Sequence, residues 1–175
     1  MYICVLRNYF MLTFESITPY EPGIISSLLS ESYGELLSSG AQFWQGEKKN
    51  WIKFDAEVFD NPATVGQCVF LTRVNARIIG FSSFDPRHGA LSGRIGHNCI
   101  LPAFRGQGFG TYQLYETLRR LTMRSIRKAV ATTSEHPFFI PAQRMYLSCG
   151  FRETKREDNH RQPEYRVIEY EKELI

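Results

Sequence analysis

The 175-residue sequence lacks the features that mark several large classes of protein. Its four cysteines, Cys4, Cys68, Cys99 and Cys149, are widely spaced and include no C-x-x-C pair. This pattern fits neither a zinc site nor a dense disulfide framework. No apolar run reaches the roughly 20 residues that cross a bilayer, and a formal net charge of +3 is small for a nucleic-acid-binding protein. We therefore expect a cytoplasmic protein with reduced thiols that binds no metal, nucleic acid or membrane.

The amino-terminal segment MYICVLRNYFMLTF is apolar but carries one basic residue, Arg7, and no small-residue cleavage site, so it does not predict a signal peptide. Met11 is an alternative start, which would make residues 1–10 an upstream extension. With 43% hydrophobic and 14% aromatic residues, the chain can bury a sizeable core. Its length predicts a single domain over residues 1–175. Composition leaves open whether the protein is a monomer or a homodimer.

The spacing of apolar residues predicts strands interleaved with helices. The expected strands are 12–19, two strands within 67–86 around the turn at Asn75-Ala76, 94–101, 128–134, 151–157 and 164–174. The expected helices are 21–37, a short helix at 53–60, 111–126 and 140–150, the last with Gly150 at its carboxyl-terminal cap. This order predicts an α/β (α+β) fold with a mixed central sheet covered by helices on both faces.

The segment ILPAFRGQGFGTYQLYETLRRL, residues 100–121, places three glycines between a strand and an amphipathic helix. The first N–H groups of a helix have no internal partner and lie at the positive end of its dipole, so they bind phosphate well. Glycine permits a close approach and a positive φ angle. No lysine follows, which excludes a G-x-x-x-x-G-K-[ST] loop, and Gly106, Gly108 and Gly110 do not fit G-x-G-x-x-G. The segment predicts a site for a phosphate-bearing ligand.

Residues 105–110 read R-x-x-G-x-G, and here the sequence resembles the GNAT superfamily of N-acetyltransferases, whose pyrophosphate-binding signature is [RQ]-x-x-G-x-[GA]. Residues 100–102, Ile-Leu-Pro, match the family's Val/Ile-x-Pro element at the end of the preceding strand. A helix pattern A-x-x-x-Y-x-x-x-G-F recurs in register at residues 142–151. The resemblance covers about residues 66–155, whereas the amino-terminal third matches only in its strand-then-helix order.

The resemblance implies acetyl-CoA as the acyl donor, between two parallel strands, 96–101 and 128–133, that splay apart. It implies the following cofactor-binding residues: Cys99, Ile100, Leu101, Arg105, Gly106, Gln107, Gly108, Phe109, Gly110 and Thr111. Arg119 and Arg120 either add positive charge near the phosphates or form a solvated helix face. Phe139 stands where the family has a CoA-contacting asparagine.

The implied reaction is direct attack of a primary amine on the acetyl thioester. Tyr146 stands where many members carry the acid that protonates the departing thiolate; its structural alternative is a packed aromatic residue. Many members carry a basic glutamate at a position that is Arg94 here, and no acid lies between Arg87 and Pro102. The candidates for the base are therefore His97 and Glu135, or water relayed from them.

The acceptor is expected to be a small-molecule or peptide amine. The second splayed strand is followed by SEHPFF, in which Glu135 and His136 are candidates for binding it. Residues 44–60 supply aromatic and acidic side chains for the same purpose: Trp44, Trp51, Phe54, Asp55, Glu57 and Asp60. Cys99 is interpreted as inert packing and not as a nucleophile, because nothing nearby lowers its pKa.

Two other functions stay open at this point. The missing strand glutamate favours a catalytically silent sensor or regulatory module that binds CoA or acyl-CoA, whereas the retained Tyr146 favours an enzyme. The third reading is a nucleotide-binding domain, which would bind ATP as well as it binds CoA.

Overall fold

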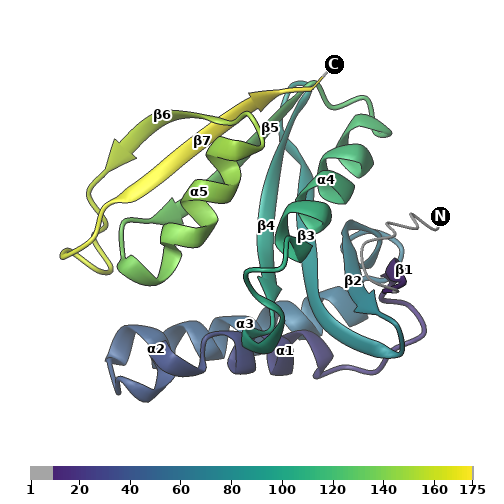
Figure 1. Ribbon diagram of the computed structural model, residues 1–175, viewed down its shortest axis with the longest axis horizontal. Coiled ribbons are helices and arrows are strands. Elements are labelled where there is room, and N and C mark those ends of the chain that lie inside the picture. Colours follow the sequence, from purple (N-terminus) through teal and green to yellow (C-terminus); the bar gives the residue numbers. More distant parts are fainter. Residues whose placement is uncertain (1–9, 175) are drawn as a thin grey trace. The chain divides into compact units, whose positions relative to one another are not determined.

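A computed structural model describes residues 10–174 of the chain (Figure 1). Its seven strands form one sheet in the order β1-β2-β3-β4-β5-β7-β6. The described residues form two compact units. The first unit consists of residues 10–83 and His97–Gln113, and the second unit consists of Phe84–Gly96 and residues 114–174. Among the described residues no helix is long and apolar enough to cross a membrane. The predicted extension at residues 1–10 lies outside the described residues except for Phe10.

The first unit contains an antiparallel β1-β2-β3 arrangement with three helices. Its elements are β1 (Leu12–Ser16), α1 (Ile24–Ser32), α2 (Gly34–Ser38), α3 (Gln42–Asp60), β2 (Val69–Val74), the first part of β3 (Arg77–Gly89), the last part of β4 (Ser92–Ile100) and the start of α4 (Phe109–Thr122). The predicted hairpin is confirmed, and Asn75 takes the left-handed φ of 53° that its turn requires.

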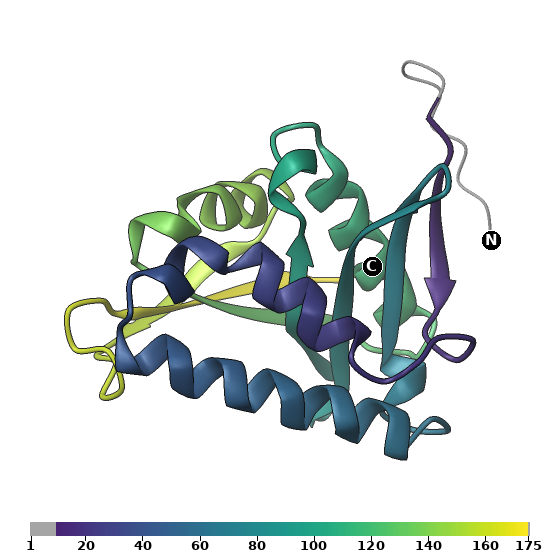
Figure 2. The ribbon, with the colours of Figure 1, turned by 90° about the horizontal axis from the view of Figure 1, so that it is seen from below.

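Helices cover both faces of the sheet in the first unit. Leu71 of β2 packs in the core with Ile25 of α1 and Trp51 of α3, and α1 and α3 lie side by side (Figure 2). The next residue, Thr72, points to the opposite face, where its hydroxyl donates to Gln113 Oε1 of α4 at 2.6 Å. Every residue of β2 except one is buried. The predicted two-sided cover is therefore confirmed for this unit.

The prediction of a short helix at 53–60 was wrong, because α3 begins at Gln42 and runs for 19 residues. Its buried residues, Trp44, Trp51, Asp55 and Val58, recur at helical spacing along the whole length. Polar residues and Gly46 between them hide this period in the sequence.

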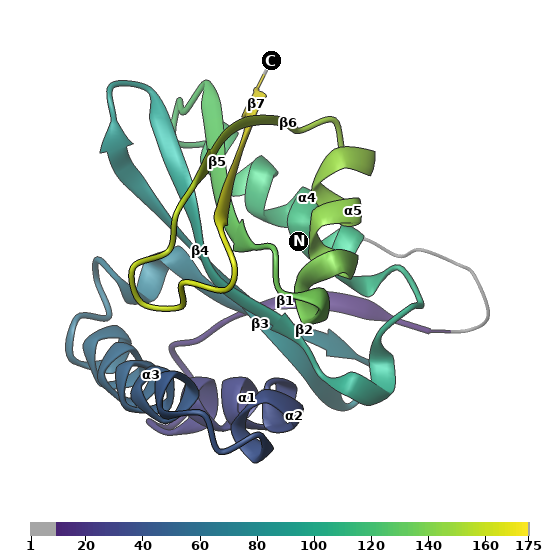
Figure 3. The ribbon, with the colours of Figure 1, turned by 90° about the vertical axis from the view of Figure 1, so that its left-hand side faces the viewer.

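The second unit combines three strands with the last part of β3, the first part of β4 and the rest of α4. Its other elements are β5 (Lys128–Ser134), α5 (Ile140–Ser148), β6 (Arg152–Glu157) and β7 (Val167–Glu173). β7 pairs antiparallel with both β5 and β6, and α5 lies against this part of the sheet (Figure 3). The parallel pairing predicted for β4 and β5 is confirmed; it covers Ser92–Arg94 against Lys128–Val130, although both strands continue.

Candidate active site

The glycine turn begins where β4 ends in the first unit. Leu101 still donates its N–H to Ile79 O of β3 at 2.8 Å, and Pro102–Phe104 then form a 3-10 turn. Gly106 and Gly108 adopt left-handed φ angles of 74° and 86°, which other residues adopt at a cost of about 1 kcal/mol. Two of the three glycines of the turn thus use the positive φ that glycine permits, whereas Gly110 lies within α4.

The amide groups at the start of α4 have no acceptor within the helix. The helix begins at Phe109, and the first bond of its ladder runs from Tyr112 N–H to Gly108 O at 3.2 Å. The N–H groups of Phe109, Gly110 and Thr111 precede that bond and are the unpaired donors of a helix start. A methyl group built on Gly106 meets no atom within 4 Å, and one on Gly108 meets only the ring of Tyr112 at 3.9 Å. This open, amide-lined turn fits a diphosphate.

Arg105 anchors the turn. Its Nε donates to Ile100 O at 3.0 Å, and its second terminal nitrogen donates to Ser32 O at the end of α1. The guanidinium group thus ties the end of β4 to α1 through two backbone carbonyls. This arrangement holds the charge beside the turn and shapes its backbone.

Cys99 of β4 is buried in the core of the first unit. Burial raises the pKa of its thiol to about 11, so the reactive thiolate is scarce at neutral pH. The Cys99 carbonyl oxygen would lie 2.1 Å from a Cβ atom on Gly80 of β3. Gly80 is therefore needed for β3 to approach this part of β4.

His97 lies two residues before Cys99 and points to the same face of β4. Its half-buried ring packs against Phe54 of α3, with ring centroids 5.0 Å apart, and its carbonyl accepts a hydrogen bond from Ser83 Oγ at 2.9 Å. Burial lowers the pKa of His97, and the carboxylate of Glu47 on α3 partly opposes that shift. The imidazole is consequently neutral, and able to accept a proton, at neutral pH.

Tyr146 lies in the second unit, on α5, and only 3% of it is exposed. Gly150 has a φ of 81°, and the N–H groups of Phe151 and Gly150 donate to Tyr146 O and Leu147 O. This is a Schellman ending, which requires a left-handed residue at Gly150 and brings Phe151 back onto Tyr146; their ring centroids lie 5.3 Å apart. The Y-x-x-x-G-F spacing thus has a direct structural cause.

The acetyltransferase (GNAT) domain family model matches residues 66–153, half of the chain. The chain belongs to the GNAT acetyltransferase family. Its match begins just before β2 and ends in β6, so it includes the glycine turn and the Tyr146 helix. No curated protein matches the sequence.

Solved structures share the GNAT fold at low sequence identity. A protein from Desulfovibrio desulfuricans assigned to the GNAT family is 14% identical, with a TM-score of 0.74 over 95% of this chain and 99% of that one. Ard1 from Thermoplasma volcanium is 14% identical, with a TM-score of 0.68 over 94% and 98%. A Bacillus subtilis acetyltransferase in complex with CoA is 12% identical, with a TM-score of 0.55 over 61% and 76%.

Glu135 of this GNAT acetyltransferase lies in the second unit and is engaged by two arginines. Arg166 donates from its side chain to both carboxylate oxygens, at 3.0 Å each, and from its backbone N–H at 3.1 Å; Arg156 adds an ion pair. These bonds, those from Arg166 above all, lower the pKa of Glu135 to about 2. A carboxylate held in this way is a weak proton acceptor. The neighbouring His136 uses Nδ1 to accept the N–H of Phe138 at 3.1 Å.

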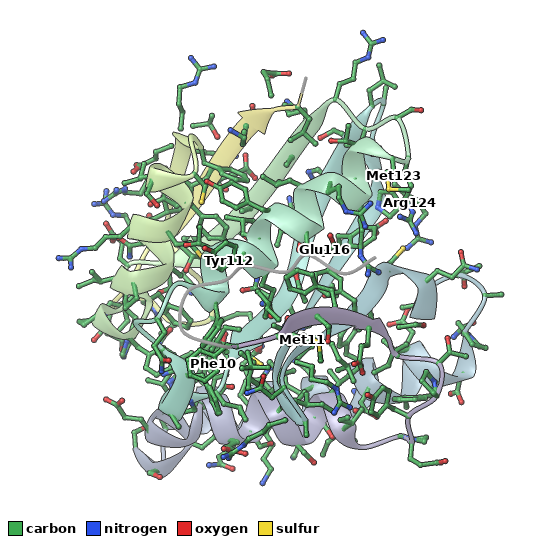
Figure 4. The ribbon with its side chains drawn as sticks, turned by 45° about the vertical axis from the view of Figure 1, so that its right-hand side comes forward. Phe10, Met11, Tyr112, Glu116, Met123 and Arg124 are labelled. Atoms are coloured by element: carbon green, nitrogen blue, oxygen red, sulfur yellow. The ribbon has the colours of Figure 1, made fainter. Side chains whose placement is uncertain are left out.

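Arg119 and Arg120 both bind Glu116 of α4, with nitrogen–oxygen distances of 2.7 and 2.8 Å. Glu116 is 4% exposed, and it lies on α4 well before Met123 and Arg124 (Figure 4). Glu116 therefore neutralises part of the charge of Arg119 and Arg120 within the helix, which favours the structural interpretation of these two arginines.

The structure separates the aromatic and acidic side chains of α3 into different roles. Trp44, Trp51 and Asp55 are buried, and Phe54 contacts His97. Asp55 accepts N–H groups from Gly23 and Ser26 and so caps α1. Glu47, which sequence reasoning passed over, is the carboxylate that influences His97. In the sequence, only the seven-residue helical spacing between Glu47 and Phe54 could have indicated that Glu47 lies near His97.

Proposed function

We propose that this GNAT acetyltransferase moves an acetyl group from acetyl-CoA to a primary amine by direct attack. The observation that carries the proposal is the glycine turn, in which unpaired amides at the start of α4 follow two left-handed glycines. Such a turn binds a diphosphate through its N–H groups and the positive end of the helix dipole. The CoA complex among the similar structures supports the same cofactor.

The backbone N–H groups of residues 107–111 would hold the diphosphate, with Arg105 stabilising the turn. The backbone of residues 99–101, at the end of β4, would bind the pantetheine arm. Because the Leu101 N–H already bonds to Ile79 O, another N–H of this segment would stabilise the oxyanion. When bound, acetyl-CoA supplies a thioester whose carbon–sulfur bond breaks as the amine nitrogen bonds to the carbonyl carbon.

The chain supplies a base and an acid for the two protons. His97 accepts a proton from the acceptor ammonium, because burial keeps its imidazole neutral. Tyr146 donates its phenolic proton to the departing sulfur, a role that rests on the register of the Y-x-x-x-G-F motif. The two arginines on Glu135 make it a weaker candidate for the base than His97.

The test combines calorimetric titration of CoA with a thiol-release assay on acetyl-CoA. Gly108→Glu introduces a carboxylate at the turn and is expected to weaken CoA binding on the order of a hundred-fold through charge repulsion. Gly40→Glu is the matched control, because Gly40 also has a positive φ, 71°, and open space around it. Equal CoA affinity for wild type and Gly108→Glu would refute the cofactor site.

The assay also separates the enzyme from the sensor. An enzyme releases CoA thiol faster when a suitable primary amine is added. Tight CoA binding without amine-dependent thiol release, across amines of varied size and charge, would favour the sensor. ATP competing with CoA at equal concentration would favour a nucleotide-binding domain.

A further inference from the structure

One flank of α3 carries three half-buried side chains, Phe43, Glu47 and Phe54. Their spacing of four and seven residues places them on one stripe of the helix. The stripe borders the buried face of α3, which is formed by Trp44, Trp51, Asp55 and Val58. Glu47 thus lies one turn after Phe43 and about two turns before Phe54, at the edge of the helix interface, neither in the core nor fully in solvent.

His97 connects this flank of α3 to β4 within the first unit. Its ring centroid lies 5.0 Å from that of Phe54. The Glu47 carboxylate raises the pKa of His97 against the larger effect of burial, which means that it lies within electrostatic reach of the imidazole. Asn50 donates to Glu47 Oε1 at 3.2 Å and helps to orient it.

We infer that Glu47 binds the ammonium group of the acceptor beside Phe43, with the carbon skeleton of the acceptor extending along α3 toward Phe54. The inference rests on the proposed function and adds to it the class of acceptor. A cation beside aromatic rings and opposite a half-buried carboxylate is stabilised by both. The favoured acceptor is a primary amine on an apolar or aromatic skeleton. It has no carboxylate of its own next to the nitrogen.

Among the described residues, one charged group is found to act on the pKa of His97. Glu47 is the charged group on α3 that acts on it, and the lysines of that helix, Lys48, Lys49 and Lys53, are exposed. From β3, Ser83 binds only the backbone carbonyl of His97. Removing the charge of Glu47 is therefore expected to lower the pKa of His97 further.

The experiment compares 2-phenylethylamine with L-phenylalanine, which differ by one carboxylate beside the amine. Steady-state thiol release is measured for wild type, Glu47→Gln and the control Glu35→Gln, which removes an exposed carboxylate from the neighbouring helix α2. In Glu47→Gln, KM for 2-phenylethylamine should rise about ten-fold. The variant should also prefer 2-phenylethylamine over L-phenylalanine less strongly than wild type does, as measured by the ratio of kcat/KM. Glu35→Gln should behave as wild type.

The pH profile distinguishes binding from a structural role. The acid limb of kcat/KM should move to lower pH in Glu47→Gln, because His97 loses the carboxylate that favours its protonated form. Unchanged KM and unchanged acid limb in Glu47→Gln, with wild-type thiol release intact, would overturn the inference alone. Wild type that binds CoA but acetylates neither amine nor any other would instead overturn the proposed function.

Discussion

Asp55 illustrates how one buried residue can organise a unit. It is 3% exposed, yet its two carboxylate oxygens accept the N–H groups of Gly23 and Ser26 at 2.6 and 2.9 Å. The carboxylate thereby supplies to α1 the cap that a local serine or aspartate usually provides. It also fixes α1 to α3, on which the proposed acceptor site depends.

Asp55→Ala should lower the free energy of unfolding by about 2 kcal/mol, because it leaves two helix donors without their acceptor. Urea denaturation monitored by circular dichroism measures the change. Asp60→Ala, an exposed position at the end of the same helix, is the control and should be nearly neutral. Equal effects from the two substitutions would mean that the cap contributes nothing.

Tyr146→Phe tests the proposed acid. The substitution keeps the ring that packs against Phe151 and Tyr170, at centroid distances of 5.3 and 5.7 Å, and removes only the hydroxyl. We expect kcat to fall about a hundred-fold, while the dissociation constant of acetyl-CoA measured by calorimetry stays unchanged. A variant with the turnover of wild type would remove Tyr146 from the acid role.

Elements set by local rules were predicted well from sequence. The glycine turn and the Tyr146 helix follow from spacing, because a left-handed residue is required at Gly108 and at Gly150. The start of α3 was missed, because its buried stripe is broken by polar residues. The cap on α1 could not be predicted, because Asp55 lies 32 residues from Gly23 and only the folded chain brings them together. The catalytic roles of His97, Glu135 and Tyr146 remain predictions.

Gly80→Ala tests the approach of β3 to β4. The added Cβ would lie 2.1 Å from the Cys99 carbonyl oxygen, so the backbone of one strand must move. We expect a loss of about 3 kcal/mol in the free energy of unfolding, together with weaker CoA binding, because residues 99–101 belong to the proposed cofactor site. Gly89→Ala, whose Cβ would meet only Ser92 at 3.6 Å, is the control. A fully stable Gly80→Ala variant would show that β3 can withdraw without cost.

At the scale of the whole molecule, the fold is determined by which positions are buried and not by the identity of each residue. The protein from Desulfovibrio desulfuricans shares 14% of its residues with this chain but reaches a TM-score of 0.74. Volume and polarity at core positions determine a fold more strongly than the particular side chains do. The function of a site residue depends on its particular side chain. The class of acceptor is therefore inferred from Glu47 and its neighbours and not from the shared fold.

The charges of the molecule predict its response to acid. Several carboxyl groups have pKa values below their ordinary range: Glu135 at about 2, held by Arg166 and Arg156, and Glu153, lowered by Arg156. Burial acts in the opposite direction on Glu116, but Arg119 and Arg120 still leave its pKa lowered. A group whose pKa is lower when folded stabilises the protein above its unfolded pKa, near 4.3, and loses that contribution as pH falls through the folded value.

The free energy of unfolding should therefore decline slightly below about pH 6.5, where the unfolded state protonates His97 more readily than the folded state does, and fall more steeply between about pH 5 and 2. Urea denaturation at pH 7, 4 and 2.5 measures the slope. Glu135→Gln should show a shallower decline than wild type, because it has one fewer carboxylate to protonate. Molar salt should also flatten the wild-type curve, since these pairs are partly exposed and screened. Parallel curves for wild type and Glu135→Gln would mean that the Arg156 and Arg166 contacts do not persist in solution.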